Sequence, residues 1–142
     1  MKRRGRSSGV FLDELEFMVK ERRRYMAQTT FHQVDQSMQH CIQECLGCHS
    51  TCLQTVQHCL MMGGEHAEAA RIQLLLDCAE ICQTSANFML RGSDLHMHTC
   101  GLCAEVCERC VQSCARMGND PQMQACAEVC RRCAESCRQM AA

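Results

Sequence analysis

The sequence predicts an all-α fold: an antiparallel up-down-up-down four-helix bundle with a cysteine-lined core, preceded by a short N-terminal extension. Three observations predict it. Apolar residues recur at helical spacing from Phe31 to the C-terminus, short glycine-containing breaks interrupt that pattern three times, and no segment alternates as a strand would. Short connections between long helices make successive helices antiparallel neighbours. The 142 residues suffice for one such domain with a real core.

Residues 1–28 are expected to form a basic extension that precedes the bundle. The stretch 1–9 reads MKRRGRSSG, a basic and Gly/Ser-rich composition that predicts disorder, and residues 10–26 can form a short amphipathic helix. Acidic side chains from Asp13 onward interrupt the apolar run, so the sequence shows neither a signal-peptide core nor a stretch of transmembrane length. We therefore expect a cytosolic protein with no membrane partner.

Residues 29–142 are expected to form the bundle domain. Gly63 and Gly64 mark its first break, and Gly92 and Gly118 can end the second and third helices, because glycine readily adopts the left-handed conformation found there. The other capping candidates are Ser93 or Asp94 for the third helix, and Asn119 or Asp120, with Pro121 in the first turn, for the fourth. The predicted helices span residues 31–62, 65–91, 94–117 and 120–140.

Cysteine is the most unusual feature of the composition, with 16 residues in 142. Within each predicted helix the cysteines recur mainly at intervals of three and four residues, the spacing of side chains on the inward face of a bundle helix. The repeated segments CAEVCERCVQSC and CAEVCRRCAESC carry charged residues between the thiols, as a solvated outer face requires. The cysteines are Cys41, Cys45, Cys48, Cys52, Cys59, Cys78, Cys82, Cys100, Cys103, Cys107, Cys110, Cys114, Cys126, Cys130, Cys133 and Cys137.

A bundle core made mostly of cysteine is under-filled, because a thiol occupies much less space than the leucine usual at these positions. Disulfides within one helix do not explain so many cysteines in the core. Neighbours one turn apart have Cβ atoms about 5–6 Å apart, against about 3.8 Å in a disulfide. Cross-helix bridges are less favoured, because cytosolic thiols are kept reduced and two cysteines on the second helix do not pair off with five on the first. Metal binding is the favoured interpretation.

Soft ligands in large number favour Cu(I) as the metal, with 11 methionines beside the thiolates. Cu(I) accepts two or three thiolates, and bridging thiolates allow a capacity approaching about one ion per cysteine. Structural zinc sites usually use C-x2-C units on loops, and ferredoxin-type iron–sulfur motifs end in proline, whereas no cysteine here precedes proline. A zinc- or iron–sulfur-binding protein stays as an alternative.

The segments CIQECLGCHSTC, DCAEIC, HMHTCGLCAEVCERC and CAEVCRRCAESC together resemble the cytosolic branch of the four-helix-bundle copper storage proteins over residues 31–140. The resemblance implies a tube filled with many Cu(I) ions, bound mainly by thiolates, in a protein that is often a homotetramer. In that family, histidines near one open end can take part in copper binding. His96 and His98, just before Cys100, match that role, and the other five histidines are expected at the surface.

The sequence thus predicts a cytosolic protein that stores or sequesters Cu(I), and not an enzyme. The formal net charge is −1, so no global field directs the chain to nucleic acid. The remaining alternatives are a copper-sensing helical regulator, whose basic N-terminus would contact DNA, and a helical protein held by disulfides. A sensor needs a few ligands at one site, whereas this chain offers 16 thiols.

Overall fold

The computed structural model describes residues 9–28 and 35–142, and within these ranges every regular element is a helix. The chain divides into two units, Met1–Gln33 and Val34–Ala142. The first contains α1 (Gly9–Gln28), whose apolar side chains between residues 12 and 19 are exposed. The disorder predicted for residues 1–9 falls on residues outside the described ranges, except for Gly9, which is the first residue of α1.

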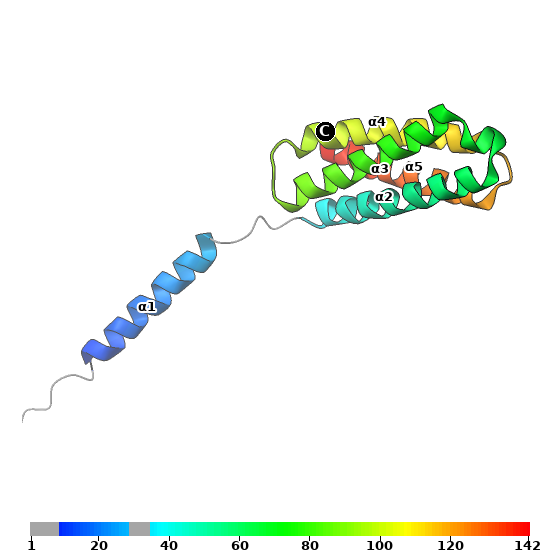
Figure 1. The fold of residues 1–142 in the computed structure, drawn as a ribbon. Coiled ribbons are helices and arrows are strands. Elements are labelled where there is room, and N and C mark those ends of the chain that lie inside the picture. Colours follow the sequence, from blue (N-terminus) through cyan, green and yellow to red (C-terminus); the bar gives the residue numbers. More distant parts are fainter. Residues whose placement is uncertain (1–8, 29–34) are drawn as a thin grey trace, which may run out of the picture. The chain divides into compact units, whose positions relative to one another are not determined.

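The second unit is an antiparallel four-helix bundle, as predicted (Figure 1). Its helices are α2 (Gln36–Met62), α3 (Ala69–Leu90), α4 (His96–Ala115) and α5 (Pro121–Ala141). Each helix packs against the next along the chain, and α5 returns to pack against α2, which closes the ring. One face of every helix therefore points into a shared central core.

The beginning of α2 lies later than predicted, because Asp35 caps the helix. The Met38 amide donates to the Asp35 carboxylate at 2.8 Å, and α2 starts at Gln36. Residues 31–34, where the sequence predicted the first helical turn, lie outside the described residues.

The connection from α2 to α3 also differs from the prediction. Gly63 and Gly64 have φ of 69° and 56°, and a short 3-10 helix, η1 (Gly64–Ala67), follows them. Positive φ at these positions favours glycine and ends α2. The helix predicted from residue 65 therefore begins only at Ala69.

The two remaining junctions confirm one capping prediction and correct the other. At the start of α5, the Asp120 carboxylate accepts hydrogen bonds from the amides of Gln122 and Met123, and Pro121 is the first helical residue. At the start of α4, neither Ser93 nor Asp94 is the cap. The Leu95 amide donates to the Ser93 hydroxyl at 3.2 Å, and the helix begins after Leu95 without a side-chain cap.

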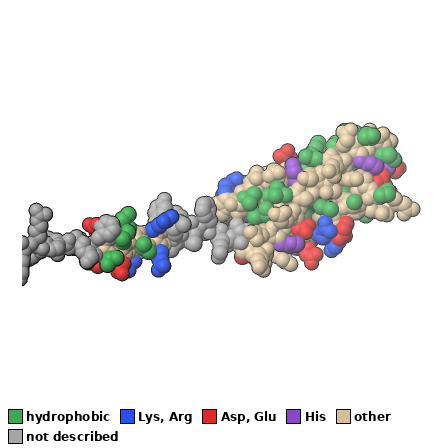
Figure 2. All heavy atoms as spheres, turned by 90° about the horizontal axis from the view of Figure 1, so that it is seen from below, with side chains coloured by type: hydrophobic (Ala, Val, Ile, Leu, Met, Phe, Trp, Pro, Cys, Tyr) green, Lys and Arg blue, Asp and Glu red, His purple; other side chains and the backbone are tan. Residues whose placement is uncertain are grey.

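The outer surface of the bundle carries charges of both signs. Arg131 lies between Glu128 and Glu135 on α5, and Arg138 pairs with Glu108 across to α4. Figure 2 shows acidic and basic side chains side by side on one face of this unit. Among the described helices, none combines the length and the apolar character needed to cross a membrane.

Candidate metal centre

The 16 thiols line the interior of the bundle. Every cysteine is at most 2% exposed, and all four helices of the bundle contribute. The 3/4 spacing produces this arrangement, because residues three and four apart share one face of a helix. Other buried side chains lie among the thiols, including Thr55, Leu75, Ser85, Met89 and Met123.

The cysteines are all free thiols. Among the closest cross-helix pairs, sulfur–sulfur distances run from 3.4 Å for Cys45 and Cys137 to 4.0 Å for Cys103 and Cys133. A metal–sulfur bond of about 2.3 Å, the value for zinc thiolates, allows two sulfurs that share an ion to lie up to about 4.6 Å apart. The observed spacing therefore fits thiolates that converge on metal ions.

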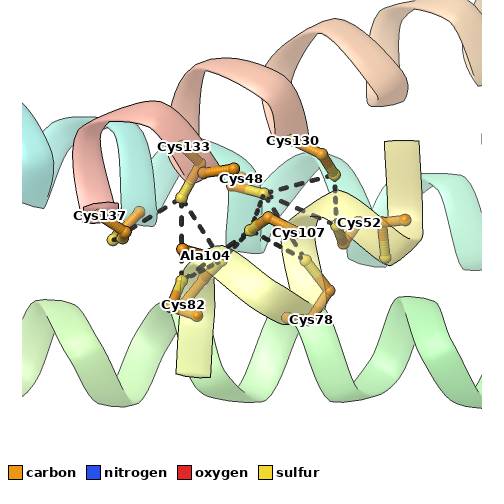
Figure 3. Close-up of a cluster of buried hydrophobic side chains, with 14 of the residues drawn as sticks. Cys48, Cys52, Cys78, Cys82, Ala104, Cys107, Cys130, Cys133 and Cys137 are labelled. Carbon is orange, nitrogen blue, oxygen red and sulfur yellow. Dashed lines mark hydrogen bonds between the residues drawn. The ribbon is translucent and has the colours of Figure 1, made fainter. Parts of the chain in front are cut away.

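The central thiols form compact groups that share members, and Figure 3 shows their side chains pointing toward one another from different helices. In each group the sulfur atoms all lie within 4.8 Å of one another. Cys48, Cys133 and Cys137 each belong to two groups, so a thiolate at these positions can bridge neighbouring ions. The groups are Cys45–Cys103–Cys133–Cys137, Cys48–Cys82–Cys107–Cys133, Cys48–Cys52–Cys78–Cys130 and Cys41–Cys100–Cys137.

Hydrogen bonds among the thiols shift neighbouring pKa values in opposite directions. Bonds with Cys107 and Cys110 lower the pKa of Cys78, whereas bonds with Cys103 and Cys107, together with burial, raise the pKa of Cys82. One thiolate is stabilised where its neighbours keep their protons. A metal cation can take the place of those protons and stabilise several neighbouring thiolates at once. Metal binding and proton release are therefore coupled.

The two ends of the thiol column differ in their surroundings. At the end formed by the start of α4, the Cys100 thiol lies 3.8 Å from the sulfur of Met89. At the opposite end, the Cys59 thiol lies 3.6 Å from the sulfur of Met123. Four thiols near this second end stand outside the compact groups: Cys59, Cys110, Cys114 and Cys126.

The two histidines predicted as ligands lie at the start of α4. His96 is half-buried, and its Nδ1 lies 2.8 Å from the Ser93 carbonyl oxygen, while His98 is exposed. The four compact thiol groups of the described residues contain neither histidine. Their role as ligands stays a prediction.

Of the other five histidines, which were expected at the surface, three are only partly exposed and make specific contacts. His49 is half-buried, and its Nδ1 lies 2.8 Å from the Ala79 carbonyl oxygen. His58 and His66 are half-buried and both contact the carboxylate of Asp120. The sequence carried one weak signal, since His58 directly precedes Cys59 on the ladder; pairing with Asp120, 62 residues away, has no local signature. His40 is exposed, as expected, and His32 lies outside the described residues.

Comparison with known proteins places this arrangement in a family. A family profile described as "Copper storage protein" matches residues 34–142, the whole bundle. The chain belongs to the copper storage protein family. The Nmul_A1745 protein from Nitrosospira multiformis has a similar structure, with 49% identity and a TM-score of 0.72, over 75% of this chain and 96% of that one.

Two solved structures of copper storage proteins are also similar. The Cu(I)-bound copper storage protein BsCsp3 from Bacillus subtilis shares 36% identity with a TM-score of 0.70, over 75% of this chain and all of that one. A cytosolic copper storage protein from Streptomyces lividans, loaded with five coppers, shares 29% identity with a TM-score of 0.64, over 74% of this chain and 92% of that one.

Proposed function

We propose that this chain stores Cu(I) by binding many ions to the thiolates inside its bundle. One observation carries the proposal: 16 buried free thiols from four helices form a column whose central groups share sulfur atoms. A binding protein for one or two ions needs only one such group. A column of linked groups is suited to filling with many ions.

The donor set favours Cu(I) over zinc. Thiolate and thioether sulfurs select soft ions, and Cu(I) is satisfied by two or three of them. Zinc in a structural site instead closes a separate tetrahedron of four ligands. Shared thiols such as Cys48 and Cys133 cannot each complete two separate zinc tetrahedra without bridging. The Cu(I) bound in the relative BsCsp3 supports the same choice for this chain.

Copper is proposed to pass through an end of the bundle, because every thiol is buried. His96 and His98, at the start of α4, are proposed to hold ions at that mouth, since imidazole also binds copper. Each ion that enters displaces thiol protons, so loading weakens as pH falls. Replacing His96 with alanine is expected to slow transfer to a chelator while leaving total capacity nearly unchanged. Equal transfer rates would remove this role.

The location and the oligomeric state of the protein are also part of the proposal. A cytosolic location follows the Streptomyces lividans protein, and a homotetramer is supported by exposed leucines on the bundle, among them Leu60 at 55% and Leu102 at 52%. We also propose that the protein stores copper and does not catalyse a reaction.

Sedimentation of the reduced protein tests the oligomeric state. A chain shortened to residues 29–142 tests whether the bundle alone forms the copper-binding domain, which then keeps its full capacity.

The deciding experiment is an anaerobic titration of reduced, metal-free protein with Cu(I) against a chromophoric Cu(I) chelator. Storage predicts that each chain withholds many ions, on the scale of about one per cysteine, before the chelator responds. Retention of only one or two ions would overturn storage and favour a copper-sensing regulator. A visible absorption band after anaerobic purification would favour an iron–sulfur protein, and a higher capacity for Zn²⁺ than for Cu(I) would favour zinc.

A further inference from the structure

Two histidines and one carboxylate converge at the end of the bundle opposite His96. They come from three elements: His58 from α2, His66 from η1, and Asp120 from the residue before α5. The Nε2 atoms of His58 and His66 lie 2.8 Å and 2.9 Å from the same oxygen, Oδ2 of Asp120. The thiol column does not use this cluster, and copper storage does not require it.

The geometry of this cluster is fixed by contacts outside it. Oδ1 of Asp120 accepts from the amides of Gln122 and Met123 at 2.9 Å and 3.1 Å, which leaves Oδ2 directed at the two histidines. The two imidazole rings stand nearly perpendicular, at 77°, with centroids 5.8 Å apart. Their Nε2 atoms therefore approach one oxygen from different directions without stacking. A carboxylate held by a helix cap cannot rotate away when a third group binds.

The geometry points to a binding site for a borderline divalent cation, with Zn²⁺ as its representative, formed by His58, His66 and Asp120. The three ligand atoms lie within 4.8 Å of one another, so an ion at about 2.0–2.2 Å from each can sit among them. Imidazole nitrogen and carboxylate oxygen are ligands that such ions prefer. A metal ion needs the Nε2 lone pair of each imidazole, so the ring proton of each histidine lies on Nδ1 in the metal-bound state, and the two hydrogen bonds to Asp120 give way to metal bonds.

The site is open enough to receive an ion and one further ligand. The side chains of His58, His66 and Asp120 are 29%, 17% and 11% exposed. Two histidines, one carboxylate and a water molecule would complete a tetrahedron, the usual coordination of zinc. The site therefore differs from the thiol column in ligand type, in access and in the charge of the ion that it prefers.

Two neighbouring residues bear on the site. The thiol of Cys59 follows His58 in sequence but is fully buried and contacts the sulfur of Met123, so it belongs to the column. The guanidinium of Arg71 is buried and donates to the Glu65 carbonyl within η1. Burial raises the pKa of Cys59, and the positive charge of Arg71 acts in the opposite direction with a smaller effect. The positive charge of Arg71 disfavours a cation nearby, and the negative charge of the Asp120 carboxylate offsets this repulsion.

The test uses full-length protein with its thiols first filled with Cu(I) under anaerobic conditions, because free thiols would also bind zinc. Zn²⁺ is then titrated in competition with a chromophoric zinc chelator. The unaltered protein is expected to bind one Zn²⁺ per chain at this site. His58→Gln, His66→Gln and Asp120→Asn are each expected to weaken that binding more than about 100-fold, since removing a group that only holds a metal ligand in place already costs 10–100-fold. Asparagine keeps the helix cap while removing the charge.

His40→Gln is the matched control, because His40 is an exposed histidine on α2 whose Nε2 lies 3.8 Å from a Glu44 oxygen. This variant should bind Zn²⁺ as the unaltered protein does. Long-range proton–nitrogen spectra of the unaltered protein give a second readout that needs no variant. Zn²⁺ should shift the ring nitrogens of His58 and His66 and leave those of His40 in place.

Two results would overturn the site. One is equal Zn²⁺ affinity in His66→Gln and His40→Gln proteins; the other is a spectrum in which Zn²⁺ moves neither His58 nor His66. Failure of copper storage would look different. If the thiols took up no Cu(I), zinc would fill them in every variant, but the difference of one ion between the His66→Gln and His40→Gln proteins would remain.

Discussion

The two halves of the thiol column use the same residue type to different extents. In the half that includes Cys45 and Cys137, thiols of α2, α4 and α5 form groups whose sulfurs lie within 4.8 Å of one another, and Cys82 of α3 belongs to the adjoining group. In the half that ends at Cys59, the inward positions of α2 and α3 include Thr55 and Leu75. The first half also contains the non-thiol residues Ser85 and Met89, so the halves differ in how closely their thiols cluster and not in whether packing residues are present.

The two ends of the thiol column also differ in the side chains that border them. The end near Cys100 is closed by the sulfur of Met89, with His96 at its margin. The end near Cys59 is bordered by a polar cluster in which His58 contacts Asp120. Each end therefore has a thiol beside a methionine sulfur and histidine nearby, but only the end near Cys59 brings two histidines onto one carboxylate. This contrast leads to four predictions.

The largest effect is expected from removing a central group of thiols. Changing Cys48, Cys82, Cys107 and Cys133 together to alanine should lower Cu(I) capacity by at least about four ions, because two of these thiols also serve neighbouring groups. The measurement is anaerobic Cu(I) titration against a chelator. Circular dichroism confirms that the variant keeps its helices.

A matched control removes the same number of thiols from the other half. Changing Cys59, Cys110, Cys114 and Cys126 to alanine should cost fewer ions, because these thiols belong to none of the compact groups found in the described part of the chain. Equal losses in the two variants would show that compactness in the metal-free protein does not govern capacity.

Lowering the pH is expected to release Cu(I) from the two halves of the thiol column one after the other. Below the ordinary thiol pKa, each thiol that binds copper must first lose a proton, so affinity should fall by about tenfold per pH unit for each proton displaced. Ions held by the less clustered thiols should leave first as pH falls from 7.5 to 5.5. Chelator competition at several pH values follows this loss. A single step involving all ions would contradict the distinction between the halves.

The sequence was sufficient for the fold and for the direction of the thiols. The 3/4 spacing of cysteine on four segments depends only on helix geometry, and it correctly predicted that residues such as Cys107 and Cys130 face inward. Helix ends were less accurate. Asp35 caps α2 from a position that the apolar pattern had assigned to the helix interior, and η1 takes residues assigned to α3.

The polar cluster could not be predicted, because its members meet only in the folded bundle. His66 lies in a short 3-10 helix that the sequence did not indicate, and its partner Asp120 is 54 residues away. Asp120 was identified only as a helix cap. The spacing also could not show which thiols cluster, since Cys107 and Cys110 lie on the same ladder of three- and four-residue intervals although only Cys107 belongs to a compact group.

Adding a thiol to each half should have different consequences. Thr55→Cys extends the ladder between Cys52 and Cys59 and should raise capacity by about one ion, at a cost of about 1 kcal/mol because Gln122 loses its 3.0 Å hydrogen bond to the Thr55 hydroxyl. Titration measures the first effect and denaturant unfolding of the metal-free protein the second.

The paired change in the other half is Ser85→Cys. The Ser85 hydroxyl is buried and has no hydrogen-bond partner among the described residues, so its replacement should stabilise the metal-free protein by about 1 kcal/mol. Capacity should change less than in Thr55→Cys, because the thiols around Cys82 are already clustered. A larger gain from Ser85→Cys would reverse the ranking of the two halves.

The smallest effect concerns the polar end itself. Hydrogen bonds from His58, and also from the Met123 amide and His66, lower the pKa of Asp120 to about 2, so the carboxylate is charged throughout the physiological range. Asp120→Ala removes the cap of α5 and should cost about 1 kcal/mol, or about 4 °C in Tm, whereas Asp120→Asn keeps the cap and should cost less. Asp94→Ala is the control, because α4 begins without a side-chain cap. Thermal unfolding of the reduced, metal-free proteins compares the three. If Asn and Ala cost the same, the charge shared with the histidines, rather than the cap, is what stabilises this end of the bundle.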